Sequence, residues 1–124
     1  MKTAFVVEDG RTDREQIVRY LQTAGFAVVA APSVEDARTK LGQQPQQPDV
    51  IFLDVILPGQ SGFEFCRELK GSHETQAIPV VMCSTKGTDV DRTWGTMLGA
   101  DDYLAKPITA TDIQQVLQRL ILLE

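Results

Sequence analysis

Short apolar runs alternate with amphipathic segments along the whole chain. The runs lie at residues 4–7, 26–29, 50–53, 80–83 and, more weakly, 103–104. They are rich in β-branched and aromatic residues, and they are apolar at consecutive positions rather than at every second one. This pattern is typical of strands that are buried on both faces of a parallel sheet. We therefore predict five strands.

The segments between the runs carry the spacing of helices. Three of them begin with a hydroxyl residue that is followed three positions later by an acid, as in a capping box. These pairs are Ser33 with Asp36, Ser61 with Glu64, and Thr109 with Asp112. Val90, Trp94 and Leu98 recur every four residues and predict a helix before the fifth strand. Gly25 is expected to end the first helix, and the Gln- and Pro-rich residues 43–48 are expected to form a loop.

Five alternations of strand and helix predict an α/β fold, with a doubly wound parallel sheet that carries helices on both faces. The length of 124 residues fits one domain, so we expect a single domain over residues 1–124 without an effector domain. In such sheets, ligands bind beyond the carboxyl ends of the strands. The residues that follow each apolar run are therefore the candidates for chemistry.

Charge and hydropathy exclude several classes of function. The net charge is −5, the isoelectric point is about 4.8, and the basic residues are scattered, which argues against a nucleic-acid interface. No apolar stretch approaches the length that spans a membrane, and the first apolar run is too short for a signal peptide. We expect a soluble, cytoplasmic protein that does not insert into a membrane.

Polar side chains follow four of the apolar runs. Glu8 and Asp9 come after the first run, Asp54 after the third, Ser84 after the fourth and Lys106 after the fifth. Each residue alone has an ordinary explanation, such as a solvated acid or a strand-end hydroxyl. Their common position at the carboxyl ends of parallel strands favours a shared functional site, because these ends meet at one edge of the sheet.

A phosphoryl-transfer site would use these residue types. Carboxylates that lie close together repel one another unless a cation sits among them, and an all-oxygen cluster suits Mg²⁺. A lysine and a hydroxyl nearby would bind phosphate oxygens. One carboxylate could then attack a phosphoryl donor and form an aspartyl phosphate.

The same residues carry a resemblance to a known family. The segments V-V-E-D, D-V-I-L-P-G-Q-S-G, P-V-V-M-C-S-T and Y-L-A-K-P resemble the CheY-like receiver domains of bacterial two-component signalling. The resemblance covers the whole chain. It implies a flavodoxin-like (βα)5 fold with strand order 2-1-3-4-5.

The resemblance also implies roles for individual residues. Asp54 matches the phosphoacceptor, which receives its phosphoryl group from a histidine kinase, and Lys106 matches the lysine that pairs with a phosphoryl oxygen. Mg²⁺ would be held by Asp9 directly, by Glu8 through water, by Asp54, and by the backbone carbonyl of Ile56.

A conformational switch is implied as well. Ser84 matches the hydroxyl that turns toward the phosphoryl group, and Tyr103 matches the aromatic residue that moves with it. The peptide bond before Pro107 is cis in relatives. The movement would remodel the face made by the fourth helix, fifth strand and fifth helix, which binds a downstream target protein.

A narrower resemblance concerns residues 84–107. This segment is similar to the stand-alone PilH-like regulators of twitching-motility and phototaxis systems, mainly through Trp94-Gly95. Trp94 has two interpretations, a core anchor of its helix or a contact residue of the output face.

Other functions fit the residues less well. Phosphatases of the haloacid dehalogenase type need a second aspartate two residues after the nucleophile, where this chain has Ile56. A flavin phosphate would be repelled by the acidic residues 8–9. We therefore predict a binding switch rather than an enzyme that turns over an external substrate. A phosphorelay intermediate, a phosphate sink and a degenerate receiver that is never phosphorylated are the alternatives.

Overall fold

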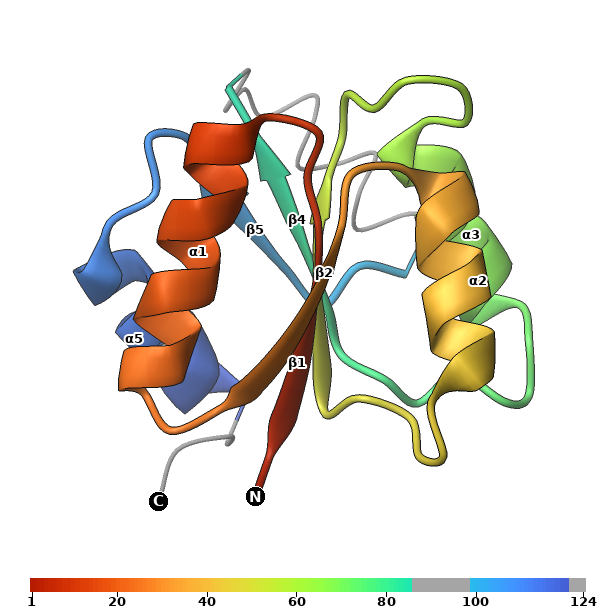
Figure 1. Cartoon of the computed structure of the whole chain (residues 1–124), viewed down its shortest axis with the longest axis horizontal. Helices are drawn as coiled ribbons and strands as arrows, with labels where there is room; N and C mark the ends of the chain where they lie inside the picture. Colours follow the sequence, from red (N-terminus) through yellow and green to blue (C-terminus); the bar gives the residue numbers. More distant parts are fainter. Residues whose placement is uncertain (86–98, 121–124) are drawn as a thin grey trace.

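Five parallel strands form one sheet in a computed structural model of the chain, which describes residues 1–85 and 99–120. The strand order is β2-β1-β3-β4-β5, so the predicted α/β fold and strand order are confirmed (Figure 1). The strands are β1 (Thr3–Val7), β2 (Ala27–Ala31), β3 (Val50–Asp54), β4 (Val80–Ser84) and β5 (Asp102–Ala105). The described helices are α1 (Arg11–Thr23), α2 (Val34–Gln43), α3 (Gly62–Lys70) and α5 (Ala110–Arg119).

Helices cover both faces of the sheet, with α1 and α5 on one face and α2 and α3 on the other (Figure 1). Successive side chains of a strand point to opposite faces. In β1, Phe5 and Val7 therefore pack in the core beneath α2 and α3, whereas Ala4 and Val6 pack in the core beneath α1 and α5. These two cores explain why the apolar runs are continuous.

The predicted helix starts are confirmed. The hydroxyl groups of Ser33 and Ser61 each accept a hydrogen bond from the backbone N–H three residues later, at the start of α2 and α3. Thr109 forms the complete capping box with Asp112 at the start of α5. These bonds satisfy N–H groups that have no partner within the helix.

The second strand begins at Ala27, one residue later than predicted. The backbone N–H of Phe26 instead donates to the carbonyl of Leu21 at the end of α1, and its side chain is buried against that helix. Gly25 makes this turn possible, because its φ of +96° is costly for residues with a side chain.

Two sequence predictions concern residues that the structure does not describe. The predicted helix with Val90, Trp94 and Leu98 lies outside the described residues. The helical part of the predicted output face therefore lies outside them too.

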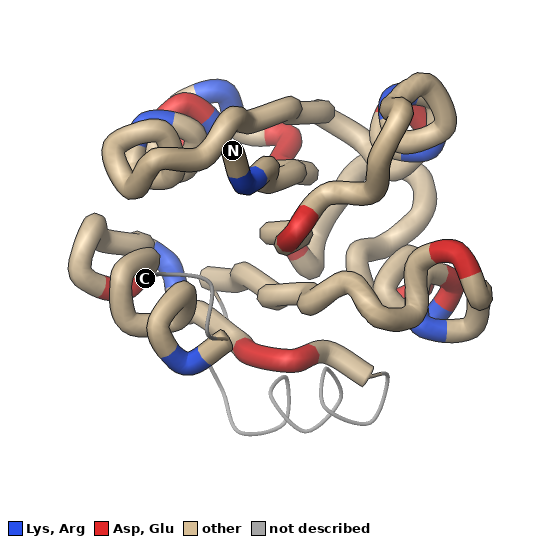
Figure 2. Tube along the Cα trace, turned by 90° about the horizontal axis from the view of Figure 1, so that it is seen from below, with Lys and Arg blue, Asp and Glu red and all other residues tan. Residues whose placement is uncertain are grey.

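The surface carries charges of both signs. Figure 2 views the layers end-on and shows Lys and Arg interspersed with Asp and Glu over the described helices. Within residues 1–85 and 99–120, no helix is both long enough and apolar enough to cross a membrane.

Candidate functional site

The polar residues that follow the strands lie at one edge of the sheet. Asp54 is the last residue of β3 and Ser84 the last of β4, while Glu8 and Lys106 directly follow β1 and β5. The parallel pairing aligns these ends, because Ser84 lies opposite the last residue of β5 and its carbonyl accepts the Lys106 N–H at 2.9 Å. The structure thus places the predicted residues together.

Three carboxylates form the centre of this edge. One oxygen each from Glu8, Asp9 and Asp54 lies within 4.8 Å of the other two. The Glu8 and Asp54 side chains are only 2% and 7% exposed, whereas Asp9 is exposed. Two buried carboxylates and one at the surface give a cluster that is open on one side.

Lys106 is the main counterion of the buried carboxylates. Its Nζ donates to Glu8 Oε1 and lies 3.2 Å from Asp54 Oδ2. The lysine side chain is only 10% exposed. The peptide bond between Lys106 and Pro107 is cis, as the resemblance implies.

The negative and positive charges of the site do not balance. Burial raises the pKa of Glu8 to about 7, although hydrogen bonds from Lys106 and the Gly10 N–H act in the opposite direction. The charge of Asp54 raises this pKa further. Burial lowers the pKa of Lys106, but the Glu8 hydrogen bond and the Asp54 and Glu8 charges together raise it above its usual value. The lysine therefore stays charged, and the site holds more negative charge than the lysine can neutralise.

Gly62 fixes the backbone behind Asp54. A Cβ atom at Gly62 would lie 1.9 Å from the Asp54 carbonyl oxygen, so no larger residue fits without moving β3. The Gly62 N–H also donates to the Val55 carbonyl at 2.9 Å. This glycine lets the start of α3 pack directly against the end of β3.

The other predicted residues lie nearby in different settings. Ser84 is 1% exposed at the end of β4, and Tyr103 is 9% exposed within β5 and packs in the core beneath α2 and α3. Ile56 lies two residues beyond Asp54 and is 55% exposed.

Sequence reasoning missed two residues of α1 that lie at this edge. An Nη atom of Arg14 donates to the carbonyls of Glu8 and Asp9 at 3.0 and 3.3 Å. Asp13 Oδ2 lies 3.5 Å from Lys106 Nζ. Their proximity in the sequence to the acidic pair was the available signal, because the first turn of a helix after a strand lies over the same edge.

The residues present fit a divalent cation. Mg²⁺ prefers oxygen ligands, usually one or two carboxylates supplemented by water and phosphate. The cluster offers three carboxylates; burial is the main cause of the raised pKa of Glu8, and repulsion by the Asp54 charge adds to it. An added cation would lower this repulsion.

Comparisons with known proteins place this geometry in a family. The model of the response regulator receiver domain matches residues 4–118. PilH of Pseudomonas aeruginosa is 36% identical over 108 residues, which cover 87% of this chain and 88% of PilH. Other curated relatives are transcriptional regulatory proteins, and the chain spans about half of their length, 47% for several of them.

Solved structures agree with this match. The chemotaxis protein CheY4 of Vibrio cholerae has a TM-score of 0.88 at 28% identity, and the match covers 97% of this chain and 98% of CheY4. The receiver domain of the sensor histidine kinase PA1611 from Pseudomonas aeruginosa has a TM-score of 0.84 at 27% identity, with 97% of each chain covered. That structure contains a magnesium ion coordinated in the active-site cleft. With its CheY-like fold and a family match over residues 4–118, this chain belongs to the response regulator receiver domains.

Proposed function

We propose that this chain is a phosphorylation switch in which Asp54 accepts a phosphoryl group from the phosphohistidine of a histidine kinase. The observation that carries the proposal is the buried Asp54 carboxylate at a strand end, 3.2 Å from Lys106 and within 4.8 Å of two further carboxylates. A carboxylate in this setting can act as a nucleophile, provided that cations offset the charge of the phosphoryl group.

The transfer needs only positioning and charge neutralisation. An Asp54 oxygen attacks the phosphorus, the bond to the histidine nitrogen breaks, and its electron pair stays on the imidazole. The Lys106 ammonium leaves Asp54 for an oxygen of the arriving group. Asp9, Glu8, Asp54 and the Ile56 carbonyl would hold Mg²⁺, which supplies positive charge to the phosphoryl oxygens. Water later hydrolyses the aspartyl phosphate, which releases inorganic phosphate and returns Asp54 to its free carboxylate.

We expect the readout to use the hydroxyl of Ser84. Ser84 ends the strand beside β3, and its hydroxyl would turn to donate to a phosphoryl oxygen. Tyr103 lies on the neighbouring strand β5 and would move with it. The face that includes β5 and α5 would then bind a downstream target protein, as a two-state equilibrium shifted by phosphorylation. The 36% identity to PilH supports a role in motility or taxis signalling.

Acetyl phosphate with and without Mg²⁺ tests the chemistry. We expect the intact mass to rise by one phosphoryl group only when Mg²⁺ is present, and not to rise in Asp54→Asn. Asp36→Asn is the control, because Asp36 pairs with Lys40 on the surface of α2. A folded wild-type protein that gains no mass with Mg²⁺ present would show a degenerate receiver instead. Transfer onward to a histidine phosphotransfer domain would identify a relay or a sink.

A further inference from the structure

Lys106 has a third acidic partner, which the function proposed above does not use. Its Nζ lies 3.5 Å from Asp13 Oδ2, in addition to its contacts with Glu8 and Asp54. An ammonium group has three N–H donors. Three carboxylates can therefore take up every donor of this lysine.

The position of Asp13 on its helix does not account for this contact. An acid in the first turn of α1 is favoured by the helix dipole wherever its side chain points. Asp13 nevertheless approaches a lysine that is 93 positions away in the sequence.

Asp13 also differs from the other two partners in exposure. Its side chain is 51% exposed, compared with 2% for Glu8 and 7% for Asp54. It therefore places a fourth negative charge at the solvent side of Lys106. The neighbouring Arg14 does not form an ion pair with Asp13, and its Nη hydrogen bonds go to the backbone carbonyls of Glu8 and Asp9.

We infer that Asp13 is a positioning residue that holds Lys106 toward α1 and sets the charge at the mouth of the site. This inference rests on the function proposed above. Asp13 favours the binding of a divalent cation, because its charge adds to that of the acidic cluster. It opposes phosphorylation, because it repels an anionic donor and keeps one Lys106 donor from the phosphoryl oxygens.

The variant Asp13→Asn tests the inference through two quantities that should change in opposite directions. The affinity for Mg²⁺ alone is measured by calorimetry. The rate of phosphorylation by acetyl phosphate is measured at saturating Mg²⁺ for each protein. We expect Asp13→Asn to weaken Mg²⁺ binding about threefold and to speed phosphorylation about threefold, as for one partly screened charge. Both changes should shrink as salt is raised, and Asp13→Glu should restore both values.

Glu15→Gln is the matched control. Glu15 lies on the same helix and pairs with Arg11, and its side chain is 56% exposed, so the change removes the same charge at similar exposure. We expect both quantities to stay within about 1.5-fold of the wild type, because this charge is screened by water and salt. A merely structural role of Asp13 would lower both quantities together in Asp13→Asn, and this result overturns the inference.

The remaining outcomes separate the two proposals. In one outcome, the wild-type protein is phosphorylated, but Asp13→Asn shifts neither quantity or behaves like Glu15→Gln. This result overturns the inference and leaves the proposed function standing. A folded wild-type protein that takes no phosphoryl group overturns the proposed function and the inference with it.

Discussion

Two largely buried lysines, at opposite ends of the sheet, show how similar burial can serve different purposes. Lys70, at the end of α3, donates to Asp101 Oδ2 at 2.8 Å and to the carbonyls of Ile78 and Gln76 at 2.7 and 3.3 Å. Lys106, at the other end, is surrounded by three carboxylates. The side chains are 16% and 10% exposed. Their burial is alike, but their charge balance is not.

The charges around Lys70 are balanced. One ammonium faces one carboxylate, and Asp101 Oδ2 also accepts the Val80 N–H at 2.8 Å. The network ties the end of α3 to the starts of β4 and β5, so it stabilises the fold. Around Lys106, the negative charge exceeds the positive charge, which costs stability but prepares the site for a cation and a phosphoryl group.

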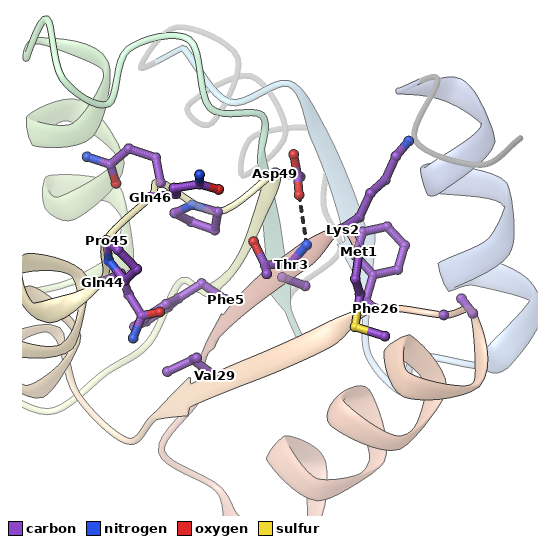
Figure 3. Close-up of a pocket in the computed structure, with 15 residues that line it drawn as sticks. Met1, Lys2, Thr3, Phe5, Phe26, Val29, Gln44, Pro45, Gln46 and Asp49 are labelled. Atoms are coloured by element: carbon purple, nitrogen blue, oxygen red, sulfur yellow. Dashed lines mark hydrogen bonds between the residues drawn. The ribbon is translucent and has the colours of Figure 1, made fainter.

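The shape of the two ends does not indicate function. A hollow of about 710 Å³ lies at the amino end of the sheet, between the start of β1 and the loop of residues 44–49 (Figure 3). Lys2 and Asp49 are the charged side chains in its lining, and Asp49 is bonded to the Thr3 N–H at 2.7 Å. The acidic end instead brings together three carboxylates and the Lys106 ammonium. Charge balance is therefore a better guide here than volume.

Lys106→Met should give the largest difference between the two ends. The change leaves the buried Glu8 and Asp54 without their counterion, and we expect a loss of about 3–5 kcal/mol in the free energy of unfolding at pH 8 without metal. Mg²⁺ should restore part of this loss, because it binds the folded state. Urea denaturation with EDTA or with Mg²⁺ measures both effects. A loss that Mg²⁺ leaves unchanged would contradict the excess of negative charge.

The pH dependence of stability should come next in size. The pKa of Glu8 is about 7 in the folded state, above its usual value of 4.5. Between these values the folded state binds more protons than the unfolded state, so stability should fall as pH rises from about 4.5 to about 7. The contribution of Glu8 is on the order of 3 kcal/mol, at about 1.4 kcal/mol per pH unit.

The Glu8→Gln variant isolates this effect from other titrating groups. We expect the difference in unfolding free energy between wild type and variant, measured in EDTA, to change over this pH range. Saturating Mg²⁺ should flatten the wild-type curve. A difference that stays constant with pH would show that Glu8 is ionised throughout.

Lys70→Met should cost less than Lys106→Met. The change removes one charged hydrogen bond and the bonds to two carbonyls, which we expect to lower the unfolding free energy by about 1–3 kcal/mol. The loss is limited because Asp101 is 37% exposed and keeps its bond from Val80. Mg²⁺ affinity, measured by calorimetry, should stay at the wild-type value. A weakened Mg²⁺ site would mean that the two ends are coupled.

The contrast between the two ends was only partly predictable from the sequence. Local signals such as the caps at Ser33 and Thr109 identified helix starts, because a cap depends on residues three positions apart. The grouping of Glu8, Asp54 and Lys106 followed from strand direction, since parallel strands end at one edge. The roles of these residues stay predictions.

Contacts between side chains of packed elements could not be predicted from the sequence. Lys70 and Asp101 are 31 positions apart, and Asp13 and Lys106 are 93 apart. Such pairs form only when a helix packs at one rotation and height on the sheet, which hydrophobic periodicity does not specify. The start of β2 was predicted one residue too early for a related reason. The backbone N–H of Phe26 donates to the end of α1, so the strand begins only after this residue.

Gly99→Ala should give the smallest effect and tests how tightly the Lys70 network is packed. The φ of Gly99 is +95°, and a Cβ atom would lie 2.9 Å from Lys70 Cγ. Gly25→Ala is the matched control, since its φ is +96° and nothing lies within 4 Å of its Cβ position. Both variants should lose about 1 kcal/mol from the left-handed backbone. Gly99→Ala should lose more, because the Lys70 stem must shift while its ammonium stays bonded. Equal losses of thermal stability in the two variants would mean that the aliphatic part of the Lys70 side chain can shift at no cost. The amino end of the sheet would then be less rigid than the hydrogen bonds of Lys70 indicate.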